Sequence, residues 1–188
     1  MPENTTKVIT NKVRLSYVRV FEPRVDDKGK AKYSCLLLIP KSDKAVMSKL
    51  RAAQREAINQ GNQGKFNGKK LNPEKLGTGQ GWDTIHDGDE SDVEDNAGCW
   101  LLNVSSGTKP GVVDRNLDPI MDSAELYSGC YARVSLNCYP YNYEGKIGIT
   151  FGLNHIQKLQ DGESLSGRTK AEDDFDALPD DEFEDSVL

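Results

Sequence analysis

The sequence predicts a mainly β fold: a closed or nearly closed barrel of five strands, decorated by one principal helix and followed by a disordered acidic tail. Three observations carry this prediction. Five runs of residues are typical of β-strands, and three of them, 12–21, 129–139 and 146–157, alternate apolar and polar side chains with the period of a β-strand. One stretch, residues 43–60, instead spaces its apolar residues as a helix does. The last 18 residues, 171–188, hold nine carboxylates and no basic side chain.

The first two strands form a predicted hairpin, residues 12–21 and 31–39. β-Branched and aromatic residues alternate with polar ones in the first run, and we expect Glu22-Pro23 to end it. Residues 26–29 form the turn between the strands. The second run holds three consecutive leucines at 36–38, which predicts a strand that is covered on both faces.

A helix is predicted directly after this hairpin. Ser42 or Asp43 caps its N-terminus, it runs to about Gln60, and Gly61 is expected to close it. Its apolar stripe indicates core packing: Val46, Leu50, Ala53 and Ala57.

Three more strands are predicted beyond a long irregular insertion at about 61–98. They are residues 99–106, 129–139 and 146–157, and the last two are joined by a hairpin turn at 142–145. Five strands are the number in an OB-fold barrel, although here the helix follows the second strand and not the third. We therefore predict an OB-fold-like domain over residues 1–170 and a disordered tail over 171–188.

The net charge of −6 is unevenly distributed along the chain. Residues 1–75 carry 17 basic and 7 acidic side chains, a net charge of +10, whereas residues 76–125 have a net charge of −9. Residues 126–170 have a net charge of +2, and the tail has −9. The body without its tail is therefore at +3, so the overall acidity does not argue against a nucleic-acid partner.

Composition excludes several other classes of protein. There is no apolar run long enough to cross a membrane and no secretory signal at the start, so we expect no membrane partner. The four cysteines lack the spacing of a zinc knuckle and indicate buried free thiols in a reducing cytoplasm. We expect no metal, no cofactor and no catalytic constellation. The sequence leaves open whether the chain forms a homo-oligomer.

The run at 130–139 is the most informative strand. One face is small and apolar from Cys130 to Cys138, and the other carries Tyr131, Arg133, Ser135, Asn137 and Tyr139. Aromatic rings stack on unpaired bases and cations neutralise phosphates, so this second row is typical of single-stranded nucleic-acid binding. In the next strand Gly148 and Gly152 are expected to leave room for a base to lie flat.

We predict that DNA lies across the outer face of the strands at 12–21, 129–139 and 146–154. Trp100 is added as a further aromatic residue and the hairpin supplies another tyrosine and a lysine. The candidate DNA-binding residues are Arg14, Arg19, Phe21, Trp100, Tyr131, Arg133, Asn137, Tyr139, Tyr141 and Lys146.

The tail combines carboxylates with regularly placed aromatic residues, which a plain solubilising tail does not need. A tethered polyanion competes with DNA for a basic groove, and its aromatic residues suit a pocket on a replication or recombination protein. The residues expected to dock partners are Asp173, Asp174, Phe175, Asp180, Asp181, Glu182 and Phe183.

Several segments of the chain together resemble a family of bacteriophage single-stranded-DNA-binding proteins. The resemblance implies an OB-fold, sequence-tolerant binding of single-stranded DNA, a role in phage replication or recombination in the host cytoplasm, and an acidic tail that contacts replication partners. The tail departs from many members in ending on Val187-Leu188 and not on an aromatic residue. The segments that carry the resemblance are KSDKA (41–45), DGDE (87–90), KPGVVD (109–114), YSGCYARVSLNCYPYN (127–142), GITFGLNHIQKLQDGE (148–163) and SGRTKAEDDFD (166–176).

Two other classes of function remain as alternatives. A metal-dependent nuclease would use the acidic residues between Asp83 and Asp95 to bind Mg²⁺, although their spacing is not that of an EF-hand. An interaction or inhibitor protein would use its acidic segments to mimic DNA, and it would have no DNA affinity even without the tail. His86 is expected in a loop with no chemical role.

Overall fold

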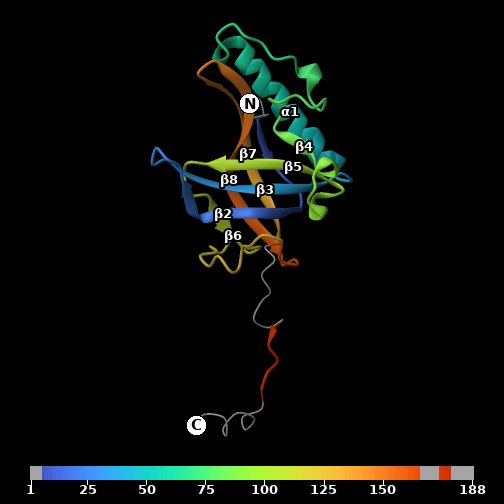
Figure 1. Ribbon diagram of the computed structural model, residues 1–188, viewed down its shortest axis with the longest axis vertical. Coiled ribbons are helices and arrows are strands. Elements are labelled where there is room, and N and C mark those ends of the chain that lie inside the picture. Colours follow the sequence, from blue (N-terminus) through green and yellow to red (C-terminus); the bar gives the residue numbers. More distant parts are fainter. Residues whose placement is uncertain (1–5, 166–173, 179–188) are drawn as a thin grey trace.

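A computed structural model describes residues 6–165 and 174–178 of the chain. The described part is mostly β-sheet with one main helix, as predicted, and Figure 1 shows that helix lying along one side of the strands. The strands and the helix are β1 (Lys7–Ile9), β2 (Val13–Val25), β3 (Ala31–Pro40), α1 (Lys44–Gln60), β4 (Ile85–Asp87), β5 (Cys99–Ser106), β6 (Gly111–Val113), β7 (Tyr131–Tyr143) and β8 (Lys146–Gln160).

Five long strands pair in a closed ring, in the order β7–β2–β3–β5–β8 and back to β7. All of these pairings are antiparallel except β5–β8, where Ser105 lies beside Gly152 in a parallel pair. These are the five predicted strands. The short strands β1, β4 and β6 attach to β7, β5 and β8 respectively. Each has three residues, which is too short for an alternating pattern to show in the sequence.

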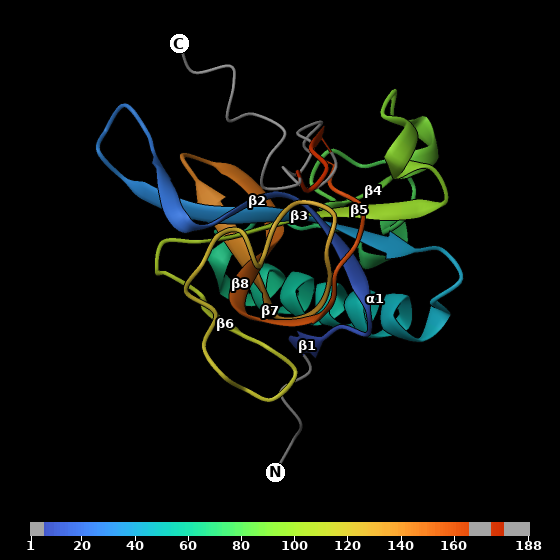
Figure 2. The ribbon, with the colours of Figure 1, turned by 90° about the horizontal axis from the view of Figure 1, so that it is seen from below.

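The core lies inside the ring and continues to the helix. Leu15, Leu37, Leu102 and Phe151 are fully buried within it. The helix buries its predicted stripe together with Ile58, and Figure 2 shows α1 running beside β7 and β8. All three leucines at 36–38 are buried, so the prediction of a strand covered on both faces is confirmed.

Several predicted ends of elements were wrong: strand β7 spans Tyr131–Tyr143 and not 129–139, and strand β8 continues to Gln160 and not to 157. Strand β2 does not stop at Glu22-Pro23 but continues to Val25, because a register shift against β3 between Arg19 and Arg24 takes the proline out of the regular ladder. Gly61 does not close the helix, which continues as a π-helical turn over Gly61–Lys65. A β-carbon at Gly61 would lie 2.2 Å from the Phe66 ring, so the glycine makes room for that buried side chain.

Asp43, one of the two predicted caps, begins the helix: its carboxylate accepts a hydrogen bond from the Val46 amide at 3.1 Å.

The segment 61–98 is largely irregular, as expected, but it contains short helical turns and β4, so His86 lies on a strand and not in a loop. No helix among the described residues has both the length and the apolar character needed to span a bilayer.

Only part of the tail is described. Residues 174–178 are exposed, and the Phe175 side chain has 75% of its surface accessible. Five of the residues predicted to dock partners lie outside the described residues: Asp173, Asp180, Asp181, Glu182 and Phe183.

Candidate nucleic-acid interface

The alternation predicted for β7 is present in the structure. The five residues of the small apolar row are buried, and the residues between them are partly or largely exposed. The exposed row, however, does not form one continuous surface. Tyr131 pairs with Arg14 and Gln160 at one end of the strand, whereas Tyr139 pairs with Thr150 toward the other. Strand β1 pairs with the middle of the row, at Ser135 to Asn137.

Tyr139 and Tyr141 lie against the glycines of the neighbouring strand. A β-carbon at Gly148 would lie 2.3 Å from the Tyr141 hydroxyl, and one at Gly152 would lie 3.2 Å from the Tyr139 ring. The glycines were expected to leave room for a base. Instead, the tyrosine rings themselves occupy that room, which keeps the rings close to β8.

Two adjoining hollows of about 460 and 720 Å³ form a groove over β3 and β5. Arg24, Lys32 and Ser105 line both hollows and so join them. The groove also reaches the β2–β3 turn and the β7–β8 hairpin. We call it the β3–β5 groove. Its further lining includes Lys30, Ser34, Trp82, Thr84, His86, Asn103, Tyr139, Tyr141 and Thr150.

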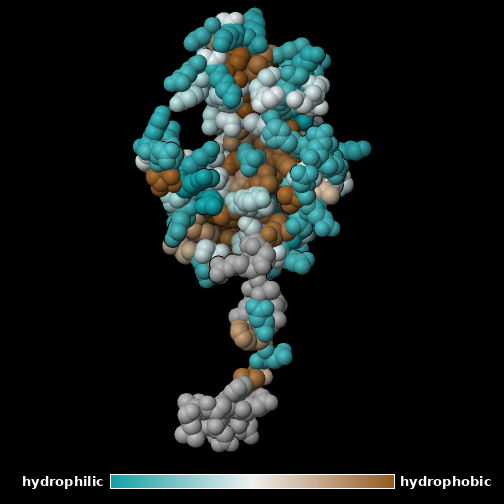
Figure 3. Space-filling view, viewed as in Figure 1, coloured by the Kyte–Doolittle hydropathy of each residue, from teal (hydrophilic) through white to brown (hydrophobic). Residues whose placement is uncertain are grey.

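The surface of the ring around this groove has a mixed character. In Figure 3, which has the view of Figure 1, the middle of the face over β2, β3 and β5 is apolar and its rims are hydrophilic. The side chains of two cations that line the groove, Arg24 and Lys32, make no hydrogen bond or ion pair within the described residues. These two cations therefore keep their charge and their hydrogen-bond donors available for a ligand.

The cations beside Tyr131 are engaged within the protein. Arg14 donates to the carbonyl oxygens of Gly129 at 3.1 Å and Glu163 at 2.7 Å. Lys12 donates to the Gln160 side chain at 3.0 Å. The Lys12 ammonium also lies 4.8 Å from the centroid of the Tyr131 ring. This cluster ties the start of β2 to the chain that leaves β8.

The other predicted residues are dispersed over the ring. Arg19 and Phe21 line a third hollow of about 790 Å³ that shares no residue with the groove. Arg133 donates weakly to the Thr10 carbonyl, at 3.4 Å, and Lys146 is exposed beside the β7–β8 turn. Trp100 packs against the core, 4.7 Å from the Lys41 ammonium. Of the ten predicted residues, the structure thus brings Tyr139 and Tyr141 to the groove, whereas these five, together with Arg14, Tyr131 and Asn137, do not line it.

Three of the acidic residues that suggested a nuclease, Asp83, Asp87 and Asp89, are engaged in ion pairs. Asp83 bonds to Arg51, and Asp87 and Asp89 share Lys41, each at 2.5 Å. Hydrogen bonding to Lys41 is the main cause that lowers the pKa of Asp87. Within the described residues, no group of three metal-ligating side chains comes together. These carboxylates therefore shape the insertion around the groove.

The four cysteines are free thiols, and three of them are buried. Burial raises the pKa of Cys35 and of Cys138 to about 12, which keeps both thiols neutral and unreactive.

Sequence reasoning missed several residues of the groove. Arg24 was not singled out because the first strand was expected to end at Glu22-Pro23, and Lys32, in the second predicted strand, was not chosen as a candidate because a lone lysine more often lies on a solvated face. Trp82 and His86 fall in the segment that was interpreted only as irregular. An exposed cation on either side of a hairpin turn, and a tryptophan in a glycine-rich loop, were the available signals.

Comparison with known proteins places the chain in a family. The family model described as "Enterobacter phage Enc34, ssDNA-binding protein" matches residues 6–187. The chain belongs to this family. It is also 31% identical over 180 residues to the protein p50 of Acyrthosiphon pisum secondary endosymbiont phage 1, covering 92% of this chain and 94% of p50.

Solved structures share the fold. The single-stranded DNA-binding protein of bacteriophage Enc34, solved in complex with ssDNA, has a TM-score of 0.72 at 22% identity, covering 86% of this chain and 90% of that one. The bacteriophage T7 protein gp2.5, a single-stranded DNA-binding protein, has a TM-score of 0.57 at 14% identity, covering 89% and 91%. Both proteins, like the family to which the chain belongs, are described as DNA-binding proteins and not as enzymes, which agrees with the sequence prediction.

Proposed function

We propose that this chain is a sequence-tolerant single-stranded-DNA-binding protein and that the β3–β5 groove is its binding site. The observation that carries this proposal is the combination of aromatic rings with cations that have no partner within the described residues. Tyr139 and Tyr141 supply rings, and Arg24 and Lys32 supply charge. Family membership supports the ligand class, and the geometry supports the place.

The chemistry of the groove suits unpaired bases. A tyrosine ring stacks on any base because every base has a π-face, so no particular sequence is required. The polar groups in the groove include short hydroxyl side chains, among them Ser34, Ser105 and Thr150, and three carboxylates besides the cations, those of Asp26, Asp27 and Asp83. Each base stacked on a ring should contribute about 1–3 kcal/mol, and each phosphate contacted should add salt dependence.

We further propose that the acidic tail competes with DNA for this groove and docks replication or recombination proteins of the phage, in the cytoplasm of the host. Its charge of −9, tethered to the domain, would give the groove cations Arg24, Lys30 and Lys32 a local anionic competitor to DNA. Phe175 is exposed and so is accessible to a partner's pocket.

The experiment that tests this function is a titration of labelled oligo-dT by fluorescence anisotropy across a salt series, with a matched duplex in parallel. We expect tighter binding to oligo-dT than to duplex, with a log–log salt slope of about −0.7 per phosphate contacted. Equal affinity for the duplex, or no binding at low salt, would contradict the proposal. Failure to bind even without the tail would favour the DNA-mimic alternative.

The tail is tested by deleting residues 171–188. We expect oligo-dT to bind more tightly because the deletion removes the competing charge. The gain in affinity should be largest at low salt, where charges are screened least. An unchanged affinity at low salt would refute competition for the groove. The docking of partners is tested separately, by pull-down with the exposed Phe175 replaced by alanine.

A further inference from the structure

Trp82 is an aromatic residue of the β3–β5 groove that lies in an irregular segment. It lines the hollow that Tyr141 also lines, and it comes from the insertion between α1 and β4 and not from a strand of the ring. A side chain on such a segment stacks effectively on a base only if something fixes the local backbone, because ordering it during binding costs conformational entropy.

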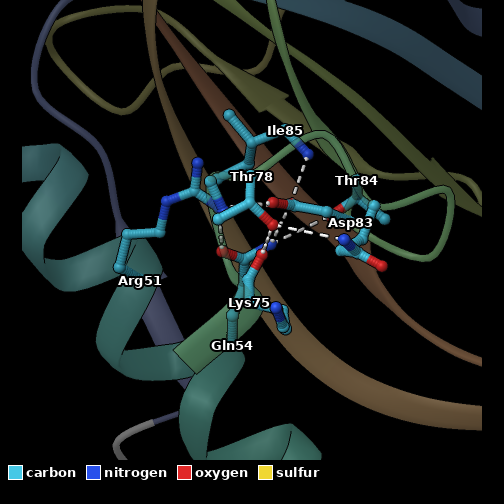
Figure 4. Close-up of polar contacts among 9 residues, drawn as sticks. Arg51, Gln54, Lys75, Thr78, Asp83, Thr84 and Ile85 are labelled. Atoms are coloured by element: carbon cyan, nitrogen blue, oxygen red, sulfur yellow. Dashed lines mark hydrogen bonds and ion pairs between the residues drawn. The ribbon is translucent and has the colours of Figure 1, made fainter. Parts of the chain in front are cut away.

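The next residue supplies that fixation. Asp83 is 3% exposed, and its two carboxylate oxygens accept hydrogen bonds from both sides of the loop, as Figure 4 shows. The Gly77 amide donates to one oxygen at 2.9 Å, and the Ile85 amide donates to the other at 3.1 Å. The carboxylate therefore bridges the backbone of the loop that carries Trp82 and the start of β4.

Two side chains of α1 complete the contacts of Asp83. Arg51 donates to both carboxylate oxygens, at 3.1 and 2.9 Å, and Gln54 donates to one of them at 3.0 Å. Arg51 also donates to the Gln54 side-chain oxygen at 2.8 Å, so the two helix residues orient each other. We call Arg51, Gln54 and Asp83 the α1 anchor. It connects the loop to a helix that packs on the core.

The anchor is held in its ionised form. Burial alone would raise the pKa of Asp83, but hydrogen bonds from Gly77 and Ile85, together with the charge of Arg51, outweigh burial and lower that pKa. A buried carboxylate with both oxygens bonded resists displacement, because moving it away from Arg51 would leave a buried charge without its counterion. The loop therefore has a defined position although it has little regular structure.

We propose that Trp82 is a base-stacking residue that forms, with Tyr141, a subsite for one unpaired base, and that the α1 anchor is the positioning device that presents Trp82 to the groove. This inference rests on the proposed function, since it assigns residues to the binding of single-stranded DNA. It adds a stacking ring that comes from outside the ring of strands.

The chain allows a direct spectroscopic test because it contains two tryptophans, Trp82 and Trp100. The variant Trp100→Phe leaves Trp82 as the only indole, and Trp82→Phe leaves Trp100, which packs beneath Lys41 and does not line the groove. We expect saturating oligo-dT to quench the tryptophan emission of Trp100→Phe and to leave that of Trp82→Phe unchanged. Quenching of Trp100 alone, or of neither, would overturn the assignment of Trp82.

Affinity provides the second measurement, by anisotropy of labelled oligo-dT. We expect Trp82→Ala to weaken binding about 5- to 150-fold, the range for removal of one base–aromatic stack, and Trp82→Phe to retain most of it. Equal effects in both variants, or no effect in either, would contradict stacking. If the unmodified chain does not change the anisotropy of the label, the proposed function itself fails. If it does, only the role of Trp82 is in question.

The anchor is tested by Asp83→Asn in the Trp100→Phe background. We expect about tenfold weaker binding with an unchanged salt slope, because the cations that meet the phosphates all remain, and a smaller quench of Trp82. The matched control is Asp114→Asn, which alters another loop aspartate that bonds backbone amides but does not line the groove, and it should leave both readouts unchanged.

Folding of the anchor variant is monitored by thermal unfolding, and binding is measured well below the midpoint. As a second variant, Gln54→Ala removes one donor and keeps the Arg51–Asp83 ion pair, so it should weaken binding in the same direction by a smaller factor. Unchanged affinity and unchanged Trp82 quenching in both folded variants would overturn the positioning role.

Discussion

Opposite ends of the β7–β8 pair use similar side chains in different ways. Beside Tyr131, Arg14 and Lys12 bond to carbonyl and amide oxygens of the protein itself. Beside Tyr139, Arg24 and Lys32 line a groove and make no such bond within the described residues. The first end is a closed cluster that holds the chain leaving β8, and the second is an open surface.

This difference shows why residue type alone does not locate a binding site. A cation that already donates to carbonyl oxygens must give up those bonds before it can contact a phosphate, and leaving a buried acceptor without a donor costs about 1–3 kcal/mol. A cation without internal partners has no such cost. We therefore expect mutations at the Tyr131 end to change stability, and mutations at the Tyr139 end to change DNA affinity.

The largest expected effect is on affinity at the open end. Replacing Tyr139 or Tyr141 by alanine should weaken oligo-dT binding by about 1–3 kcal/mol each, because each removes a stacking surface. The control is Tyr131→Ala, which should leave the dissociation constant unchanged. Anisotropy titrations of the three variants check this, and a larger loss of affinity for Tyr131→Ala than for Tyr139→Ala would reverse the comparison.

At the closed end we expect a loss of stability. Arg14→Gln should lower the free energy of unfolding by about 1.5–3 kcal/mol, since Arg14 makes charge-assisted hydrogen bonds to Gly129 and Glu163. Urea unfolding at neutral pH measures this effect. Exposed Lys30→Gln, in the β2–β3 turn, serves as a control with little expected change. A stable Arg14→Gln protein that binds DNA poorly would contradict the account.

A third prediction concerns acid. Because the folded state lowers the pKa of Asp83 below its ordinary value of 3.8, the stabilisation it provides is complete above that value. It disappears as the pH falls through the ordinary value toward the lower folded one. Unfolding by urea at pH 7 and near pH 3 should therefore show a smaller acid effect for Asp83→Asn than for the parent. Asp92→Asn, an exposed control, should behave as the parent does.

A final prediction concerns a glycine that accommodates a tyrosine. Gly148→Ala would place a β-carbon 2.3 Å from the Tyr141 hydroxyl, so the ring must move away from β8. We expect stability to fall by about 1–3 kcal/mol from overpacking, together with weaker DNA binding. Gly64→Ala, where nothing lies within 4 Å, is the matched control. If Gly148→Ala changed neither stability nor DNA binding, Tyr141 would have no fixed position beside β8.

The sequence predicted the long strands and the helix because each is long enough for a periodic pattern to show. It also predicted Tyr139 and Tyr141 as candidate site residues. It could not predict that Tyr131 and Tyr139 separate, because alternation specifies a face of a strand but not how that strand curves around a ring. Arg24 was missed because a bulge admits Pro23 into β2, and Trp82 because its position depends on Asp83 meeting Arg51, 32 residues away in the chain.

The most direct test of the open groove is the salt dependence of oligo-dT binding in two double variants. Arg24→Gln with Lys32→Gln removes the cations of the groove, and Lys12→Gln with Arg14→Gln removes those beside Tyr131. We predict that the first pair reduces the log–log salt slope by about 1.4, at roughly 0.7 for each phosphate no longer neutralised, and that the second pair leaves the slope unchanged. A reduced slope in the second pair and an unchanged slope in the first would contradict the account.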